Sequence, residues 1–390
     1  MTRVVLFSGL LVLGLLGSQL LPALAGTAYP AVSFGVSLLT MWGLSFIMIH
    51  VGYEFEIDRG NLRAYGWDYL VAATAAAFPW IFCSLYFVLV LAPPDLWSDS
   101  RVWKESLLAA RFAAPTSAGV LFSMLAAAGL SATWVFRKAR ILAIFDDLDT
   151  VLLMIPLKMM IVGAKWQLAV VVALMGILVW IAWRFLHRVR IPATWPWVLS
   201  YAAGITLASE IVYHFSLRVD DTVPIHLEVL LPAFVLGCVM ARPAGHDPHS
   251  GAGEPAGPES AREETVATAI SAAFMVLVGL SLPPLSEAAG PDGSLPGWGT
   301  IALHVLALTV ISNLGKMFPA ITYRAEATWR ERLAVAVSMF PRGEVGAGIL
   351  VVSLSYGIGG PLLTAAMLSL ALNLVLTGPY IAVVKKLIGK

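Results

Sequence analysis

Apolar runs of about 20 residues, the length that a helix needs to cross a bilayer, follow one another along almost the whole chain. In lipid, the backbone of such a run must satisfy its own hydrogen bonds, and a helix does so within one segment. The 59% hydrophobic fraction and the mean hydropathy of +0.83 exclude a soluble protein of ordinary composition. We therefore predict an all-α polytopic membrane protein with about 12 transmembrane helices. The runs centre on residues 4–25, 31–53, 68–92, 106–130, 140–162, 166–186, 196–215, 225–241, 264–283, 299–321, 332–355 and 361–384.

Positive charges are distributed unevenly over the loops that these spans define. Of the 25 Lys and Arg residues, 17 fall on one side and 4 on the other, and the remaining 4 lie inside spans. Because cytoplasmic loops carry an excess of Lys and Arg, both termini are predicted to be cytoplasmic. Residues 243–262, rich in Gly, Pro, Ser and Ala, are predicted to form a flexible linker on the same side.

The predicted fifth span contains three carboxylates within one helical turn: Asp146, Asp147 and Asp149. Each costs roughly 2.5 to 3.5 kcal/mol at the centre of a membrane helix, whereas each surrounding Leu, Ile or Val returns only about 0.3 to 0.6 kcal/mol. This helix is therefore predicted to face protein or a water-filled cavity. Ionisable residues in such a place indicate an ion or proton pathway.

Lys316, in the predicted tenth span, lies at a depth that matches the acidic cluster. Asp147 follows Arg140 by seven residues, about 10 Å along a helix. Lys316 precedes Arg324 by eight residues, about 12 Å from the same surface. A lysine in mid-span favours a carboxylate partner, so we predict that Lys316 pairs with Asp146 or Asp147. Neighbouring residues on a helix point about 100° apart, so the other carboxylate can face a cavity.

Two predicted spans contain helix breakers, Pro115 in the fourth and Pro341 with Gly343 in the eleventh. Proline removes a backbone hydrogen bond and glycine loosens the helix, so both spans are predicted to be interrupted near the middle of the membrane. Broken helices in corresponding positions of two halves are typical of an ion site at a repeat interface. Spans three to five and ten to twelve would then be inverted repeats.

Other polar residues within the spans leave alternatives open. Thr150 can offer its hydroxyl to a cation or bond its own backbone. Arg111 can bond carbonyls released by the nearby helix break or pair with Glu344. Glu210 and His214 stand four residues apart, which predicts a structural pair on one helix face rather than a proton relay. Arg111 and Lys158 stay without an assigned role, and Asp149 does not map onto a motif position of the family named below.

Motifs for cofactor chemistry are absent from the sequence: there is no Walker motif, dinucleotide fingerprint or Cys/His metal spacing. We predict no cofactor, no nucleic-acid partner and no enzymatic activity. An intramembrane aspartyl protease would need two Asp residues on facing helices, whereas Asp146 and Asp147 are adjacent on one helix. A channel or a non-transporting membrane sensor is the remaining alternative class. Cys83 and Cys238 lie in apolar runs and are predicted to be core residues.

Four motifs together resemble the monovalent cation/proton antiporter superfamily, most closely its branch of bacterial sodium/proton antiporters and glutathione-gated potassium efflux proteins. They are Pro115-Thr116-Ser117, Asp146-Asp147, Gly315-Lys316 and Pro341-Arg342-Gly343-Glu344-Val345-Gly346. The resemblance runs from about residue 107 to the C-terminus. It implies a sodium/proton antiporter fold with two crossed discontinuous helices, elevator-type alternating access, a homodimer and a bacterial inner-membrane location.

The resemblance also implies domains and roles. A dimerisation domain would comprise residues 1–66 and 163–242, and an ion-transporting core residues 67–162 and 299–390, with a linking helix at 263–298. Asp147 would bind the cation or the proton, and Asp146 would pair with Lys316. Members with this Asp-Asp and Lys set are typically electrogenic, and potassium-efflux members have Gln in place of Asp146, which favours Na+ over K+. Supporting roles are expected for Thr116, Ser117, Asp149, Thr150, Arg342 and Glu344.

Overall fold

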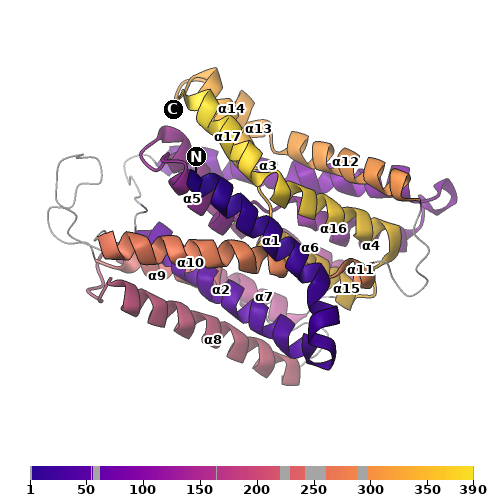
Figure 1. Ribbon diagram of the computed structural model, residues 1–390, viewed down its shortest axis with the longest axis horizontal. Helices are drawn as coiled ribbons and strands as arrows, with labels where there is room; N and C mark the ends of the chain where they lie inside the picture. Colours follow the sequence, from indigo (N-terminus) through magenta and orange to yellow (C-terminus); the bar gives the residue numbers. More distant parts are fainter. Residues whose placement is uncertain are drawn as a thin grey trace. The chain divides into compact units, whose positions relative to one another are not determined.

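The computed structural model describes residues 2–53, 55, 62–163, 165–219, 229–241, 261–288 and 297–389. Nearly all of these residues are helical, and an isolated bridge between Val189 and Met240 is the one strand-like pairing among them (Figure 1). The all-α prediction is confirmed. The predicted linker lies outside the described residues up to position 260, and the side chain of Lys158 also lies outside them.

Six helical stretches in the described part of the chain are long and apolar enough to cross a membrane. A seventh is counted if α16 (Gly360–Val375) and α17 (Thr377–Ile388), bent by 47° at their junction, form one span. Other predicted spans coincide with helices that are short or charged, such as α9 (Leu230–Val239) and α6 (Trp134–Val162), which carries the acidic cluster. The six stretches are residues 2–53, 63–91, 100–127, 166–185, 265–287 and 298–321.

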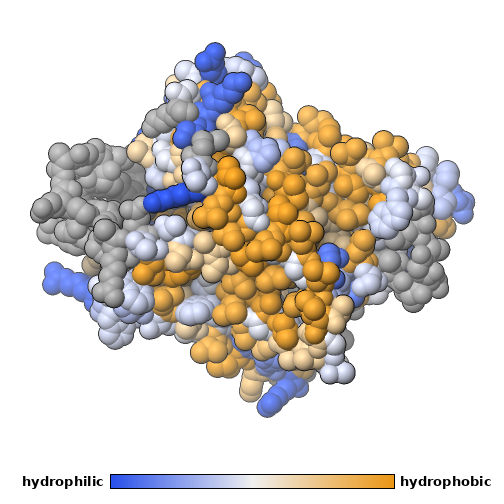
Figure 2. All heavy atoms as spheres, in the orientation of Figure 1, coloured by the Kyte–Doolittle hydropathy of each residue, from blue (hydrophilic) through white to orange (hydrophobic). Residues whose placement is uncertain are grey.

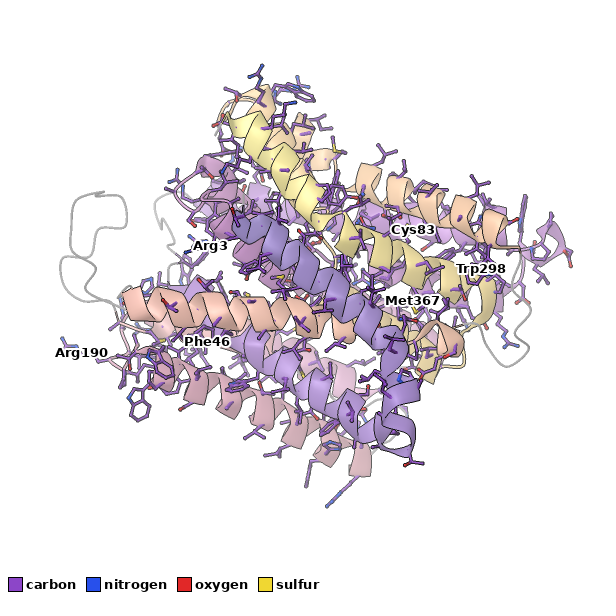
Figure 3. All side chains as sticks on the ribbon, in the orientation of Figure 1. Arg3, Phe46, Cys83, Arg190, Trp298 and Met367 are labelled. Carbon is purple, nitrogen blue, oxygen red and sulfur yellow. The ribbon has the colours of Figure 1, made fainter. Side chains whose placement is uncertain are left out.

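The surface of these helices is apolar. Leu13, Leu16 and Leu20 on α1 (Thr2–Ala25) are each 59% exposed, and Trp298 at the start of α12 (Trp298–Gly315; Figure 3) is 65% exposed. Figure 2 shows apolar side chains over much of the visible face. Exposed apolar side chains on this scale suit a lipid environment. The chain is a multi-pass membrane protein.

The chain divides into two compact units. Unit 1 comprises Met1–Ser33, Asn61–Leu157 and Met275–Lys390, and unit 2 comprises Phe34–Gly60 and Lys158–Phe274. Unit 1 contains α1, most of α6, the end of α10 (Ala261–Leu280), and the helices α3 (Leu62–Tyr86), α4 (Ser100–Ala109), α5 (Ala118–Ala127), α11 (Leu285–Ala288), α12, α13 (Phe318–Ile321), α14 (Trp329–Ser338), α15 (Glu344–Ser355), α16 and α17. Unit 2 contains most of α2 (Tyr29–Tyr53), α7 (Trp166–Phe185), α8 (Trp195–Val219), α9 and most of α10.

Small residues allow close helix packing in unit 1, as is common in membrane proteins. A Cβ added at Gly315 of α12 would lie 2.5 Å from the backbone nitrogen of Pro79 on α3. A Cβ at Gly14 of α1 would lie 2.1 Å from the carbonyl oxygen of Val276 on α10. These contacts leave no room for a side chain, so backbone packs directly on backbone.

Unit 2 is held together in the same way. A Cβ at Gly52 of α2 would lie 2.1 Å from the carbonyl oxygen of Phe234 on α9. The indole of Trp42 donates a hydrogen bond of 3.0 Å to the carbonyl of Leu199, which ties α2 to α8. Cys238 on α9, like Cys83 on α3 of unit 1 (Figure 3), is buried, which confirms the prediction for both cysteines.

Candidate functional site

The predicted fourth span is broken in its middle, as expected. Helix α4 continues as a 3-10 turn over Ala110–Ala113, the backbone is then non-helical through Ser117, and α5 begins at Ala118. Pro115 lies within this break. The hydroxyl of Ser117 accepts a hydrogen bond of 3.3 Å from the backbone N–H of Val120, so the second half of the span begins with an N-cap.

The predicted eleventh span is broken between α14 and α15, around Pro341, and the two breaks contact each other. The backbone N–H of Ser117 donates to the carbonyl of Pro341 at 3.0 Å. The Thr116 hydroxyl donates to the carbonyl of Met339 at 3.1 Å. Each break therefore satisfies polar groups that the other exposes. This arrangement is the pair of crossed discontinuous helices that the resemblance implied.

The acidic cluster of α6 lies beside these breaks and is buried. Asp146, Asp147 and Asp149 are 0%, 2% and 3% exposed. An oxygen of Asp146, Oδ2, accepts a hydrogen bond of 2.8 Å from the backbone N–H of Thr116 in the first break. The same oxygen forms an ion pair of 2.7 Å with the Nζ of Lys316. Of the two partners predicted for Lys316, the structure has Asp146.

Lys316 owes its position to the end of a helix. Helix α12 ends at Gly315, and Lys316 is its C-cap residue, with a fully buried side chain. A cation at a helix C-terminus is favoured by the helix dipole. Asp147 and Arg342 both lie close enough to act electrostatically on the lysine. The Lys316–Asp146 ion pair and Asp147 therefore interact electrostatically.

The other residues of this helix turn have separate environments. The Thr150 hydroxyl donates to the backbone carbonyl of Asp146 at 2.9 Å, so of its two alternatives the structure has the backbone bond. Asp149 lies near Asp146 and Arg111 and accepts a hydrogen bond from the hydroxyl of Tyr69 on α3. Asp149 and Asp147 differ by about 200° around the helix, so they face different surroundings.

Arg342 joins the second break to three neighbouring segments. Its side chain is fully buried. The guanidinium donates to the carbonyl of Ala113 at 2.9 Å in the first break and to that of Ser312 at 3.0 Å in α12. It also donates to the amide oxygens of Asn313 at 2.7 Å and Asn373 at 3.3 Å. These bonds link the broken spans to the helix turn that precedes Lys316.

Glu344 sits where the second half of each broken span begins. It is the first residue of α15, and its carboxylate accepts a hydrogen bond of 2.5 Å from the hydroxyl of Ser117, the N-cap of α5. Its own backbone N–H and that of Gly119 lie close enough to act electrostatically on the carboxylate. A negative charge there stabilises the positive ends of two helix dipoles.

Two residues whose roles were open also have clear positions. Arg111 is fully buried, donates to the backbone carbonyl of Thr150 and lies 5.0 Å from the ring centroid of Trp80. This bond goes to α6 and to neither of the expected acceptors. In unit 2, Glu210 and His214 form the predicted pair at 3.5 Å.

Sequence reasoning missed Asn313, Asn373 and Tyr380, which surround Arg342. The Tyr380 hydroxyl accepts a hydrogen bond of 2.8 Å from the amide nitrogen of Asn313. The available signal was the presence of two asparagines inside apolar runs, where an unsatisfied amide is costly. The bend between α16 and α17, close to Asn373, was also missed, although Gly378-Pro379 just after the junction was an available signal.

Comparison with known proteins agrees with this geometry. The sequence matches a family model described as "Sodium/hydrogen exchanger, transmembrane" over residues 2–386. Among solved structures, the sodium/proton antiporter MjNhaP1 from Methanocaldococcus jannaschii, determined at pH 8, is similar with a TM-score of 0.56 and 14% sequence identity, and the alignment covers 100% of both chains. At this identity, the likeness concerns the fold. A search of curated proteins gives no significant match.

Proposed function

The chain belongs to the transmembrane sodium/hydrogen exchanger family and is a cation/proton antiporter, and from this premise we propose that it exchanges Na+ for H+ at Asp147. One observation carries the proposal: the buried Asp147 adjoins the Lys316–Asp146 ion pair at the crossing of two broken helices. Asp146 is held by Lys316 and by the Thr116 backbone. Asp147 is then the carboxylate that a cation and a proton share in turn.

Competition for the same oxygens accounts for exchange. A carboxylate offers the oxygen ligands that hard cations prefer, and the same oxygens accept a proton. A site that binds one or the other and opens alternately to the two sides of the membrane couples their movements. Asp149, Thr150, Thr116 and Ser117 support this site, and Arg342 and Glu344 hold the helix breaks.

Alternating access is proposed to follow the elevator type, in which a core of residues 67–162 and 299–390 moves against a dimerisation domain. The division of the chain into two compact units supports the core part of this assignment, since the acidic cluster, Lys316 and both breaks belong to unit 1; Met1–Ser33, placed above in the dimerisation domain, also belong to unit 1. We further propose a homodimer in a bacterial inner membrane, with cytoplasmic termini and a role in pH homeostasis.

The nature of the cation is the finer part of the proposal. The Asp-Asp and Lys set favours electrogenic Na+/H+ exchange, since antiporters that share it are typically electrogenic. K+/H+ exchange is the alternative within the same class. A channel or a non-transporting sensor is the alternative of a different class, which a conductance independent of the proton gradient would support.

The test is proton release from everted vesicles or proteoliposomes on addition of Na+ and then of K+. We expect Na+-driven release by the wild type and at least a tenfold loss in Asp147→Asn. Asp95→Asn, the same change at an exposed loop residue, is the matched control and is expected to keep wild-type activity. Release with K+ alone would support the potassium alternative. Full activity of Asp147→Asn would refute the proposed site.

A further inference from the structure

Arg342 is a fully buried cation whose hydrogen bonds all go to neutral acceptors. They are three backbone carbonyls, of Ala113, Ser312 and Phe340, and two amide oxygens, of Asn313 and Asn373. Among the described residues, no carboxylate lies within 4.0 Å of its guanidinium. Glu344, two residues further along, bonds the Ser117 hydroxyl instead. The charge of Arg342 is therefore held in place without a counter-charge in contact.

An uncompensated buried charge is unfavourable, and proteins usually pair such a charge with a carboxylate. Asparagine offers the same acceptor geometry as aspartate but adds no negative charge. Arg342 lies close enough to act electrostatically on Lys316 and on Asp146. Its positive charge therefore also reaches the place where the transported cation is proposed to bind.

The two amides are oriented by a network that reaches across the bend between α16 and α17. The amide nitrogen of Asn313 donates to the Tyr380 hydroxyl at 2.8 Å, and that of Asn373 donates to the carbonyl of Ser369 at 3.0 Å. The Tyr380 hydroxyl in turn donates to the amide oxygen of Asn373 at 3.4 Å. With both nitrogens engaged elsewhere, both amide oxygens point toward the guanidinium.

We propose that Asn313 and Asn373 are positioning residues that hold Arg342 without neutralising it, and that its uncompensated charge lowers the affinity of the site for the transported cation. Tyr380 orients the two amides. This inference rests on the proposed Na+/H+ exchange. The asparagines act through Arg342 and do not touch the cation.

The test separates charge from packing by two substitutions at one position. Asn373→Asp keeps the shape and the bond to Arg342, adds one negative charge, and removes the bond that the amide nitrogen donates to Ser369. The attraction between this charge and Na+ is expected to lower the apparent KM for Na+ by about threefold to tenfold. This is the effect of a unit charge at a distance of order 10 Å in a partly screened site. Asn373→Leu keeps the volume but removes the bond, and is expected to lower the maximal rate without lowering KM. Ser98→Asp, a new charge in the exposed turn before α4, is the control and should leave KM unchanged.

The outcomes distinguish this inference from the proposed function. A lower KM in Asn373→Asp but not in Asn373→Leu supports it. An unchanged KM in Asn373→Asp, or a shift in the same direction in both variants, overturns it. If Asn373→Asp does not yield a monodisperse protein, Asn313→Asp places the charge on the other amide with the same expectation. If the wild type gives no Na+ response at all, the proposed function fails. The half-saturating Na+ or K+ concentration for thermal stabilisation of the purified variants then tests the charge effect alone.

Discussion

The Nζ of Lys316 lies 2.7 Å from the Oδ2 of Asp146, and neither side chain is accessible to solvent. This ion pair joins the end of α12 to the middle of α6. Because the same carboxylate oxygen accepts the backbone N–H of Thr116, the pair also reaches the break of the fourth predicted span. One contact thus connects three segments of unit 1 and places Asp147 beside a fixed charge.

Removal of one partner tests how much this ion pair contributes to the free energy of unfolding. Lys316→Met leaves the Asp146 carboxylate buried without its counter-charge, and we expect it to lower the free energy of unfolding by about 3 to 5 kcal/mol. Thermal unfolding of the purified protein measures the change. The double variant Lys316→Met with Asp146→Asn removes the stranded charge, so it should be more stable than Lys316→Met alone. A double variant that is less stable would contradict a direct interaction between the two side chains.

Gly315 immediately precedes Lys316 and lies against α3, where a Cβ would be 2.5 Å from the nitrogen and 2.8 Å from the Cα of Pro79. Gly315→Ala must push α12 away from α3, and we expect a loss of stability of about 1 to 3 kcal/mol together with reduced exchange. Gly299→Ala is the control in the same helix, since a Cβ there meets nothing within 4 Å. Equal melting temperatures for the two variants would contradict the close packing.

The ion pair of Lys316 with the acidic cluster and the two helix breaks could be predicted from sequence, because each depends on local chemistry. Counting residues along each helix places Lys316 and the acidic cluster at matching depths from the same membrane surface. Pro115 and Pro341 cannot continue a regular helix. Helix geometry alone left the choice between Asp146 and Asp147 open, because it depends on the rotation of α6 against α12, whereas the resemblance implied Asp146. The backbone N–H of Thr116 donates to Asp146 and so favours this residue as the partner of Lys316. The sequence does not reveal the direction of an N–H that a helix break leaves without its helical acceptor.

Lys138 shows a second limit of prediction from sequence. It is one of the 17 Lys and Arg residues assigned above to the cytoplasmic side, yet it lies in α6, is 8% exposed and pairs with Asp68 and Glu326, both at 3.0 Å. Its partners come from residues 70 and 188 positions away, so no local pattern could reveal the cluster. The same holds for the two asparagines around Arg342, which the fold brings together from α12 and α16.

Ser117 has two roles that one substitution can test. Its hydroxyl donates to Glu344 at 2.5 Å and accepts the N–H of Val120 at 3.3 Å. Ser117→Ala removes the N-cap of α5 and leaves the Glu344 carboxylate with one bond fewer, so we expect a loss of about 2 to 4 kcal/mol in the free energy of unfolding. Ser117→Thr keeps the hydroxyl and should retain most of the stability. Thermal unfolding of the two variants measures this, and the same loss in both would mean that packing, not the hydroxyl, is responsible.

A capping box of Thr328 and Glu331 begins α14, and both residues lie just before the predicted span of residues 332–355. The Thr328 hydroxyl accepts the backbone N–H of Glu331, and the Glu331 carboxylate accepts the backbone N–H of Thr328 at 3.0 Å and its hydroxyl at 2.8 Å. These two bonds lower the pKa of Glu331 below its ordinary value of 4.5. The unfolded chain therefore binds a proton more readily at this residue than the folded chain does.

The sign of the resulting pH dependence follows from linkage. A carboxylate whose pKa is lower in the folded state stabilises the protein above its ordinary pKa, and this contribution is lost as the pH falls through the folded value. Glu331→Gln can keep a neutral capping box but has no charge to lose. We expect the wild type to melt at a higher temperature than Glu331→Gln at pH 7, and the difference to shrink between pH 5 and pH 3, where the ordinary pKa of 4.5 lies. The difference should be small, because solvent screens this exposed group. A difference that does not change with pH would show that the Glu331 charge contributes nothing to the cap.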